Sequence, residues 1–284
     1  MTNKKVSQFP VMENMTVKEV REYLQRKKSI IIPIGVTEQH GYHLPLSTDA
    51  LIATHLSKQI GENADILVAP TFLQSFSGGG LPGTINISPA VMSLAISDML
   101  ISLASQGFRN FYLFLCHGGS ENARSLKDAI SILLRSNPSF ENVMIVLSGV
   151  WDYGRGVLDA MAGGDWHAGW FETSLVMAFE PELVQMDQLE TDIEPLLKMQ
   201  IEHPDNYQHA EKIVDDKLVV PRMSQRPDIK VGVMGYPHRA SAEIGRKAAE
   251  AIVSAAVKKI SELEAKADGV YKEVPFNPLP VIFE

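Results

Sequence analysis

Short apolar segments alternate with helix-like segments along the first half of the chain, and this alternation restricts the possible folds most. The apolar segments cover residues 29–36, 66–70, 111–116 and 143–147. Continuous apolar runs of this length are typical of strands buried on both faces, and connections of about a dozen helical residues join parallel strands. We therefore expect an α/β fold in which helices cover both faces of a mainly parallel sheet.

Helix-start signals place helices between these segments. Thr16 to Glu19 has the form of a capping box, and Ser88-Pro89 that of an N-cap followed by proline in the first turn. Residues 187–230 are polar, interrupted by proline and weakly periodic, so we expect irregular surface or an inter-subunit arm there. No domain boundary is evident, and residues 1–284 are expected to form one domain. The predicted helices span residues 16–25, 49–60, 88–105, 123–134, 170–179 and 241–267.

Composition restricts the partners and the compartment. The chain of 284 residues has a formal net charge of −8, which argues against nucleic acid or an anionic membrane as a partner. Cys116 is the single cysteine, so no intramolecular disulfide can form and a reducing compartment is expected. No apolar segment approaches the roughly 18–20 residues of a membrane span, and the N-terminus lacks a signal-peptide pattern. We expect a cytoplasmic protein.

Acidic and imidazole side chains follow the first predicted strand. Glu38, His40 and His43 lie just beyond its apolar run, and Asp49 opens the next helix. Glu38 and His40 are two residues apart, so in extended backbone they point the same way. Carboxylates and imidazoles past a buried strand suit a hydrolytic metal site. The alternative is a hydrogen-bonded polar loop, with Asp49 as an ordinary N-cap.

Two more polar segments follow the second and third predicted strands. Residues 77–84 form a glycine-rich loop, which lacks the Lys-Ser/Thr ending of a P-loop and is expected to line a substrate site. His117 directly follows the third strand. Because sites in parallel sheets lie at the carboxyl ends of the strands, we favour His117 as a metal ligand over a structural histidine. Cys116 ends an apolar run, which is more typical of an inert buried thiol than of a nucleophile.

A histidine and a glutamate mark a later segment, Trp166-His-Ala-Gly-Trp-Phe-Glu172. His167 is expected in a loop and Glu172 in the first turn of a helix. Glu172 is interpreted as a metal ligand or acid/base group, although an acid in a first turn also suits the helix dipole. The pKa range of imidazole makes His167 the best candidate for a proton shuttle. The histidines without polar neighbours are expected on the surface: His55, His203 and His209.

These segments resemble the motifs of the creatininase (creatinine amidohydrolase) family. The similar segments occur in the same order along the chain as in the family, and they are residues 38–49, 81–84, 117–119, 167–174 and 232–237. The resemblance implies a three-layer α/β/α sandwich with a mainly parallel central sheet. It also implies two divalent ions, zinc or manganese, and a hexamer or similar homo-oligomer.

The resemblance also assigns roles to residues. It implies that Glu38, Asp49 and His117 bind one metal, that His40 and a bridging Asp49 bind the other, and that His167 and Glu172 lie in the catalytic segment. Creatininase has a glutamate two positions after the histidine that matches His117. Gly119 occupies that position here, so either Glu121 or Glu172 completes the second metal site.

Other departures concern the substrate. Trp166 replaces the acid that precedes the matching histidine in creatininase, and Gly163 replaces a tryptophan, so the creatinine pocket is not reproduced. Tyr42 replaces the usual proline of the first motif. With Tyr42 and the loop at residues 77–80, the chain resembles the family members that open oxidised inositol rings. These are the 3-dehydro-scyllo-inosose hydrolases.

The expected function is therefore metal-dependent, ring-opening hydrolysis of a small polar cyclic substrate. A cyclic amide other than creatinine is the expected substrate, and two metals would activate water and polarise the ring carbonyl. The alternatives are hydrolysis of a C–C bond in a diketo-inositol ring and a non-catalytic binding protein that metal stabilises. The residues expected to contact the substrate are Tyr42, His43, Ser77, Gly79, Gly80 and Trp166.

Overall fold

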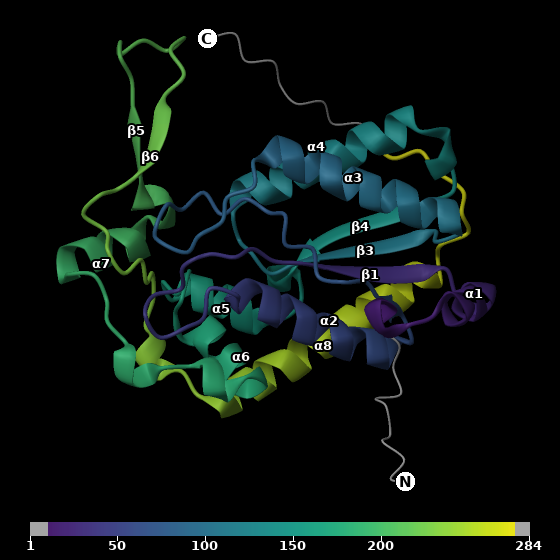
Figure 1. The fold of residues 1–284 in the computed structure, drawn as a ribbon, viewed down its shortest axis with the longest axis horizontal. Coiled ribbons are helices and arrows are strands. Elements are labelled where there is room, and N and C mark those ends of the chain that lie inside the picture. Colours follow the sequence, from purple (N-terminus) through teal and green to yellow (C-terminus); the bar gives the residue numbers. More distant parts are fainter. Residues whose placement is uncertain (1–10, 276–284) are drawn as a thin grey trace.

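A parallel four-stranded sheet forms the centre of the structure, a computed structural model that describes residues 11–275 (Figure 1). The strands lie in the order β2-β1-β3-β4, and every neighbouring pair is parallel. The predicted parallel sheet is therefore confirmed. The strands are β1 (Ser29–Ile34), β2 (Leu67–Val68), β3 (Asn110–Leu115) and β4 (Met144–Gly149).

The side chains of β1 alternate between two separate cores. Ile30, Ile32 and Ile34 pack in the core under α3 (Pro89–Gln106) and α4 (Ser120–Ser136). Ile31 points to the opposite face and packs in the core under α2 (Thr48–Ala64), α6 (Trp170–Phe179) and α8 (Ala242–Glu264). Since successive strand side chains point to opposite faces, a run without polar residues can be buried on both sides. The three-layer α/β/α sandwich is thus confirmed.

Local signals set several helix ends as expected. α1 (Val17–Arg26) begins with the predicted capping box, in which the N–H of Thr16 donates to Glu19 Oε2 at 2.6 Å. α3 begins after Ser88, whose hydroxyl accepts from the N–H of Val91 at 3.5 Å. These contacts satisfy N–H groups that a helix leaves without partners in its first turn.

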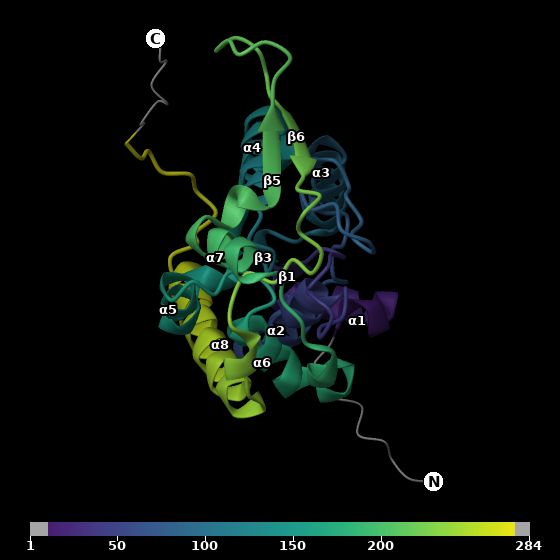
Figure 2. The same cartoon turned by 90° about the vertical axis from the view of Figure 1, so that its left-hand side faces the viewer.

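Residues 187–230 contain regular structure that the sequence pattern did not predict. α7 (Glu194–Glu202) and an antiparallel hairpin of β5 (Gln208–Glu211) and β6 (Arg222–Gln225) lie in this range. The hairpin stands away from the sandwich in Figures 1 and 2. The hairpin was not predicted because ten residues join its two strands, so no tight-turn signature marks it. An inter-subunit role for this segment stays a prediction. A further helix, α5 (Arg155–Ala162), was also not predicted.

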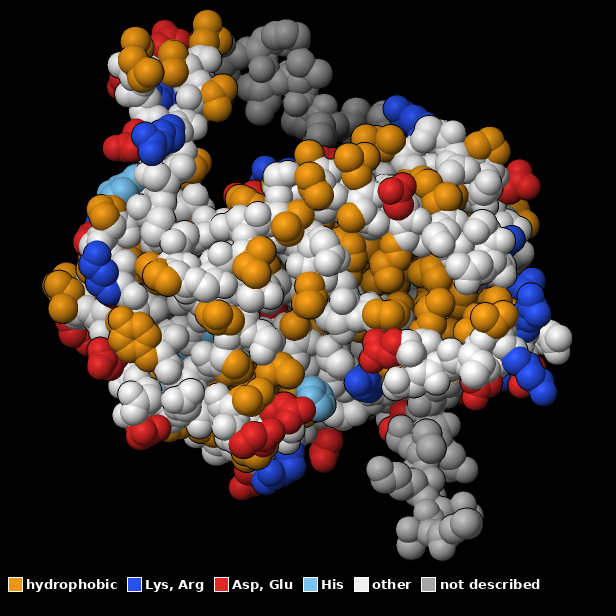
Figure 3. Space-filling model, in the orientation of Figure 1, with side chains coloured by type: hydrophobic (Ala, Val, Ile, Leu, Met, Phe, Trp, Pro, Cys, Tyr) orange, Lys and Arg blue, Asp and Glu red, His pale blue; other side chains and the backbone are white. Residues whose placement is uncertain are grey.

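α3 corrects a second expectation. By length and composition alone, this 18-residue helix is apolar enough to cross a membrane. We had expected no apolar segment as long as a membrane span. Its inner side chains Met92, Ile96 and Leu100 are buried in the core between α3 and the sheet, as in a layer helix of a sandwich. Val91 and Leu94 lie on its outer side, where Figure 3 shows apolar side chains on the face that α3 presents.

Candidate metal centre and active site

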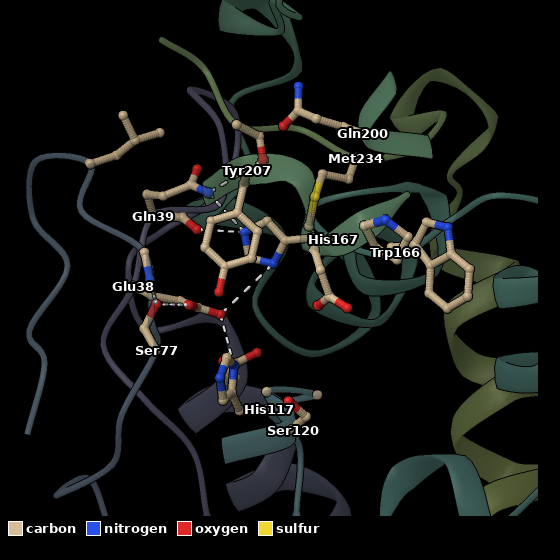
Figure 4. Close-up of a pocket in the computed structure, with 18 of the residues that line it drawn as sticks. Glu38, Gln39, Ser77, His117, Ser120, Trp166, His167, Gln200, Tyr207 and Met234 are labelled. Carbon is tan, nitrogen blue, oxygen red and sulfur yellow. Dashed lines mark hydrogen bonds and ion pairs between the residues drawn. The ribbon is translucent and has the colours of Figure 1, made fainter. Parts of the chain in front are cut away.

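Carboxylates and imidazoles gather at the carboxyl ends of β1 and β3 (Figure 4). Glu38 and His40 follow β1, His117 follows β3, and Asp49 and Glu172 lie in the first turns of α2 and α6. The parallel order of the sheet places β1 beside β3, so side chains distant in the sequence meet at this edge. The structure thus brings together all five residues that were predicted to bind metal.

Asp49 lies between two histidines. Its Oδ1 is 3.4 Å from His40 Nε2, and its Oδ2 is 3.2 Å from His117 Nδ1. All three side chains are buried. His40 Nδ1 lies 3.2 Å from the carbonyl oxygen of Glu38. An Nδ1–H donated to that carbonyl directs Nε2 of His40 toward Asp49, and histidines that bind metals are oriented in the same way.

Glu38 completes one side of the centre. Its Oε1 lies 2.9 Å from His117 Nδ1, and its Oε2 accepts a hydrogen bond from the Ser77 hydroxyl. Glu38, Asp49 and His117 offer ligand atoms that all lie within 4.8 Å of one another. Ser77 therefore supports the orientation of Glu38, whereas we had expected it to contact the substrate.

Glu172 completes the other side. Its Oε2 lies 3.7 Å from His40 Nε2, and Glu172 forms a second such group with His40 and Asp49. Glu121 belongs to none of the possible metal-binding groups among residues 11–275. Of the two acids that could replace the missing family glutamate, Glu172 is the one that shares a possible ligand group with His40 and Asp49.

A Cβ atom at position 119 has no room in this arrangement. Built on the Gly119 backbone, it would lie 2.4 Å from His117 Nε2. The glutamate that creatininase carries at the matching position could not be accommodated here without a shift of the His117 ring. The present position of the His117 ring therefore requires glycine at position 119.

Buried polar atoms without hydrogen-bond partners show that a cation fits this centre. They include Glu38 Oε1, His40 Nε2 and Asp49 Oδ2. Buried polar atoms are otherwise almost always paired, and divalent zinc and manganese accept this combination of carboxylate and imidazole donors. Asp49 belongs to both groups described above, so the residues fit two ions that share one carboxylate.

The electrostatics agree with a cation site. Burial opposes a charge on His40, yet the carboxylates of Asp49, Glu172 and Glu38 outweigh burial and raise its pKa to about 10. Burial also raises the pKa of Glu172 to about 7. The carboxylates likewise raise the pKa of His117 well above its usual value, and divalent ions would satisfy the same negative charge.

His167 lies above the two groups and differs from His40 in its protonation. Its Nε2 is 2.7 Å from the carbonyl oxygen of Gln39, and its Nδ1 is 3.8 Å from Glu38 Oε1. Burial, reinforced by the charge of His40, lowers the pKa of His167 to about 4. A neutral ring that donates Nε2–H to Gln39 keeps the Nδ1 lone pair directed into the centre. His167 also forms a third possible ligand group with Glu38 and His40.

Asp165 holds the segment that carries His167 and Glu172, and the sequence interpretation missed it. Its buried carboxylate accepts from the N–H groups of Trp170, Phe171 and Tyr236 at 2.9–3.0 Å. A Cβ on Gly169 would lie 1.9 Å from Asp165 Oδ1, so only glycine fits there. No local signal marks this role, because Asp165 lies outside the N-cap position, which is Gly169, and its partner Tyr236 is distant in the sequence.

A cavity of about 310 Å³ opens above the metal centre. Ser77, Gly79 and Trp166 line it, as predicted for substrate contacts, together with Glu38, Asp49, His117, His167 and Glu172. Gln39 and five residues from the range 200–225 also line it and were not predicted, since residues 187–230 show no motif: Gln200, Pro204, Asp205, Tyr207 and Gln225.

Three predicted substrate contacts lie elsewhere. Tyr42 is 49% exposed and is not part of the cavity wall. His43 is buried, its Nε2 lies 3.0 Å from Thr173 Oγ1, and burial lowers its pKa to about 4. Gly41 has a φ of 67° and turns the chain, which directs His43 into the protein rather than into the cavity. Gly80 is outside the wall and donates its N–H to Gln225 Oε1 at 3.0 Å.

The surroundings of Cys116 and His55 test two further predictions. Cys116 is buried, and burial raises the pKa of its thiol, which agrees with an inert side chain. His55 was expected to lack polar partners, but its Nε2 lies 2.8 Å from Glu180 Oε1. This pairing joins α2 to the end of α6, and the separation of 125 positions in the chain hid it from the sequence pattern.

The fold and the centre together define a class of protein, the metal-dependent hydrolases built on a parallel α/β sandwich. The model of the creatininase family, described as creatinine amidohydrolase, matches residues 13–260. The chain therefore belongs to the creatininase family of metal-dependent hydrolases, and the family expected from the motifs is confirmed.

Relatives in this family carry out different hydrolyses. Creatinine amidohydrolase of Pseudomonas putida is 30% identical over 177 residues, which cover 56% of this chain and 67% of the relative. Mycofactocin precursor peptide peptidase of Mycobacterium ulcerans is 28% identical over 253 residues, which cover 85% and 88%. 3-Dehydro-scyllo-inosose hydrolase of Thermotoga maritima is 28% identical over 109 residues, which cover 37% and 35%.

Solved creatininase structures share the fold. A crystal structure of creatininase superposes with a TM-score of 0.70 at 22% identity, over 90% of this chain and 98% of that one. Creatininase solved with manganese has a TM-score of 0.70, and a mutant described as "Zn-Zn type" has 0.69, both at 24% identity and the same coverage. The metals of these neighbours are those expected here, and the chain holds residue groups that could bind them.

Proposed function

We propose that this protein opens a small polar ring by hydrolysing an amide C–N bond, and that its substrate is not creatinine. The observation that carries the proposal is the position of Asp49, which is shared by two possible metal-binding groups at the base of a cavity. Glu38, Asp49 and His117 would hold one ion, and His40, Asp49 and Glu172 the other. When bound, such ions acidify water and polarise a carbonyl group.

The remaining chemistry belongs to side chains around the centre. Gln39 holds His167 through its carbonyl oxygen, so the neutral ring can accept a proton at Nδ1. His167 Nδ1 would take the proton from the attacking water and pass it to the leaving nitrogen. Ser77 keeps Glu38 in place by donating to its Oε2, and Ala168 does the same for Glu172.

Two of the relatives support cleavage of a C–N bond. Creatinine amidohydrolase and the mycofactocin precursor peptide peptidase both act, by their names, on amide-type bonds, and the peptidase matches 85% of this chain. A substrate other than creatinine is supported by Gly163 and Trp166, which depart from the creatininase pattern.

The match to 3-dehydro-scyllo-inosose hydrolase supports a second candidate function, hydrolysis of a C–C bond in a diketo-inositol ring. Both reactions begin with addition of water to a carbonyl group, so the same centre could serve either. They differ in the products, because only C–N cleavage releases an amine.

The test is a screen of the zinc- or manganese-loaded protein against creatinine, other cyclic amides and keto-inositols. Ring opening is followed by NMR, and a new amine is assayed separately. We expect turnover of a cyclic amide with one amine released per ring. Opening of a keto-inositol without an amine would establish the second candidate instead. Metal-dependent stabilisation with no turnover of any compound would favour the non-catalytic alternative.

Assembly and location remain predictions from the sequence. We propose a cytoplasmic homo-oligomer, a hexamer by family resemblance. Light scattering coupled to size-exclusion chromatography measures the mass directly, against 31.3 kDa for one chain. A mass of one chain at micromolar concentration would contradict the oligomer.

A further inference from the structure

The outer wall of the cavity comes mainly from one stretch of the chain, the end of α7 through β6. Gln200, Asp205, Tyr207 and Gln225 line the cavity from this side, opposite Glu121 of α4. We call Gln200, Asp205, Tyr207 and Glu121 the outer wall. None of them belongs to a possible metal-binding group. A substrate whose carbonyl lies at the metal centre would therefore extend toward these side chains.

Gln200 presents a buried acceptor that has no partner. The residue is 0% exposed, and its Oε1 makes no hydrogen bond, whereas its Nε2 lies 3.4 Å from the carbonyl oxygen of Leu196. Figure 4 shows the amide above Met234, at the end of the cavity away from His117. A buried acceptor without a partner is costly, so an N–H or O–H group of a ligand would be bound favourably there.

The charges of the lining have one sign. Besides the acids of the metal centre, Glu121 and Asp205 line the cavity, and no lysine or arginine is among the lining residues in the described chain. Across residues 11–275, no ion pair is formed by Glu121 or Asp205. Metal ions would offset the acids at the base but not these two. The outer end of the cavity therefore repels anions and attracts cations.

Tyr207 supplies a neutral hydroxyl to the cavity. Figure 4 shows the hydroxyl directed down the cavity toward Glu38. Burial, followed by the nearby charge of Glu121, raises the pKa of Tyr207 to about 12, so the phenol keeps its proton. A Cβ on Gly78 would lie 2.6 Å from this hydroxyl. The glycine-rich loop is thus shaped to leave room for Tyr207.

Gln225 fixes the wall to the glycine-rich loop. Its Oε1 accepts from the N–H of Gly80 at 3.0 Å, and its Nε2 donates to the carbonyl oxygen of Tyr207 at 3.1 Å. The base of the hairpin and the loop that carries Ser77 therefore form one connected surface. A connected polar surface of this kind is suited to recognising a ligand rather than to filling space.

We propose that the outer wall determines substrate specificity. The selected substrates carry N–H or O–H donors at the end remote from the reacting carbonyl. This end is neutral or cationic and bears no anionic group. This inference rests on the proposed function, because the metal centre must hold the carbonyl end. Gln200 accepts a donor of the substrate, Tyr207 exchanges a hydrogen bond with it, and Glu121 and Asp205 favour positive charge.

The test uses four hydroxamic acids that bind metal through the same group and differ in their tails. They are propionohydroxamate, 3-hydroxypropionohydroxamate, β-alanine hydroxamate and succinic monohydroxamate, with methyl, hydroxyl, ammonium and carboxylate ends. Isothermal titration calorimetry measures their Kd values on the metal-loaded protein. We expect the hydroxyl and ammonium probes to bind about ten-fold more tightly than the methyl probe, and the carboxylate probe to bind most weakly.

The possible results distinguish a failure of the inference about the outer wall from a failure of the proposed metal centre. Equal affinity of all four probes, or tightest binding of the carboxylate probe, would overturn the inference about the wall and leave the metal centre intact. If no probe bound, the metal centre itself would be wrong, and the inference would fall with it.

Substitutions locate the effect. Gln200→Met keeps the length of the side chain and removes its acceptor, so the advantage of the hydroxyl probe over the methyl probe should fall about five-fold or more. Gln188→Met is the matched control at an exposed position outside the cavity and should keep the full difference. If Gln200→Met does not fold, Glu121→Gln tests the same wall through a smaller preference for the ammonium probe. An unchanged pattern in both variants would refute the assignment.

Discussion

The backbone N–H of Ala168 donates to Glu172 Oε2 at 2.6 Å, from a left-handed backbone with a φ of 53°. A non-glycine residue in this conformation is strained, and such strain is concentrated at functional sites. The bond joins the residue after His167 to the acid beside His40. The candidate proton shuttle and the candidate ligand are therefore held as one unit, and changes to either should affect both.

The first prediction separates Glu172 from Glu121. Glu172→Gln should lose about one of two metal equivalents, because the amide is a poor substitute for a carboxylate beside His40 and Asp49. Glu121→Gln should retain both equivalents, since Glu121 lies outside the possible ligand groups. Elemental analysis of dialysed protein gives the count. Full metal occupancy in Glu172→Gln with lost turnover would instead make Glu172 an acid/base group.

The second prediction concerns the shared carboxylate. Asp49→Asn should reduce the binding of both ions, since each oxygen of Asp49 faces a different histidine. Metal content should fall below one equivalent per chain, and turnover should fall about 10³-fold or more. Asp98→Asn, at an exposed acid on α3, is the matched control and should behave as wild type. Loss of a single equivalent in Asp49→Asn would contradict the bridging role.

The third prediction concerns His167. His167→Asn should keep both metals if the ring acts only on protons, while turnover falls about 10²- to 10⁴-fold. Metal content and kcat measured on the same preparation decide between the roles. A lost metal equivalent would show that the group of Glu38, His40 and His167 binds an ion.

The fourth prediction concerns Gly119. Gly119→Ala places a Cβ where it would lie 2.4 Å from His117 Nε2, so the ring must move. Metal affinity should fall about 10- to 100-fold, as it does when the orientation of a ligand is disturbed. Competition with a fluorescent chelator measures the affinity. Gly118→Ala is the control, because a Cβ there meets nothing within 4 Å.

The fifth prediction concerns metal removal. Glu38, Asp49 and Glu172 are close together and buried or nearly so, so removing bound ions exposes their mutual repulsion. EDTA should lower the Tm by several degrees, and zinc or manganese in excess should restore it. Differential scanning calorimetry of the Asp49→Asn variant should show little response to EDTA. An equal response in that variant would place the stabilising metal elsewhere.

The sheet and the helices beside it were predictable because their signals are local. The buried run at residues 29–34 and the capping box at Thr16 depend on neighbours in the sequence. α5 and α7 were missed because they have only 8 and 9 residues, too few for a periodic pattern to stand out among glycine- and proline-containing segments. Tyr42 and His43 were placed at the substrate because they lie in the motif, but the left-handed turn at Gly41 directs them away from the cavity.

The candidate metal ligands were predictable for a different reason. Ligand chemistry restricts these positions to a few residue types at the ends of adjacent strands, and Glu38 and His117 stand out there. Asp165 and Gln200 could not be found in the same way. Their roles depend on backbone groups and cavity walls that distant segments bring close, and no pattern along the chain records such contacts.

The wall from Gln200 to Gln225 lies between α6 and α8 in the chain, while the residues that could bind metal all precede residue 173. One contiguous segment could thus be exchanged or remodelled while Glu38, Asp49 and His117 stay in place. A lineage could acquire a new substrate by changing this segment alone. The diversity of hydrolyses among the relatives is what such a division of the chain would allow.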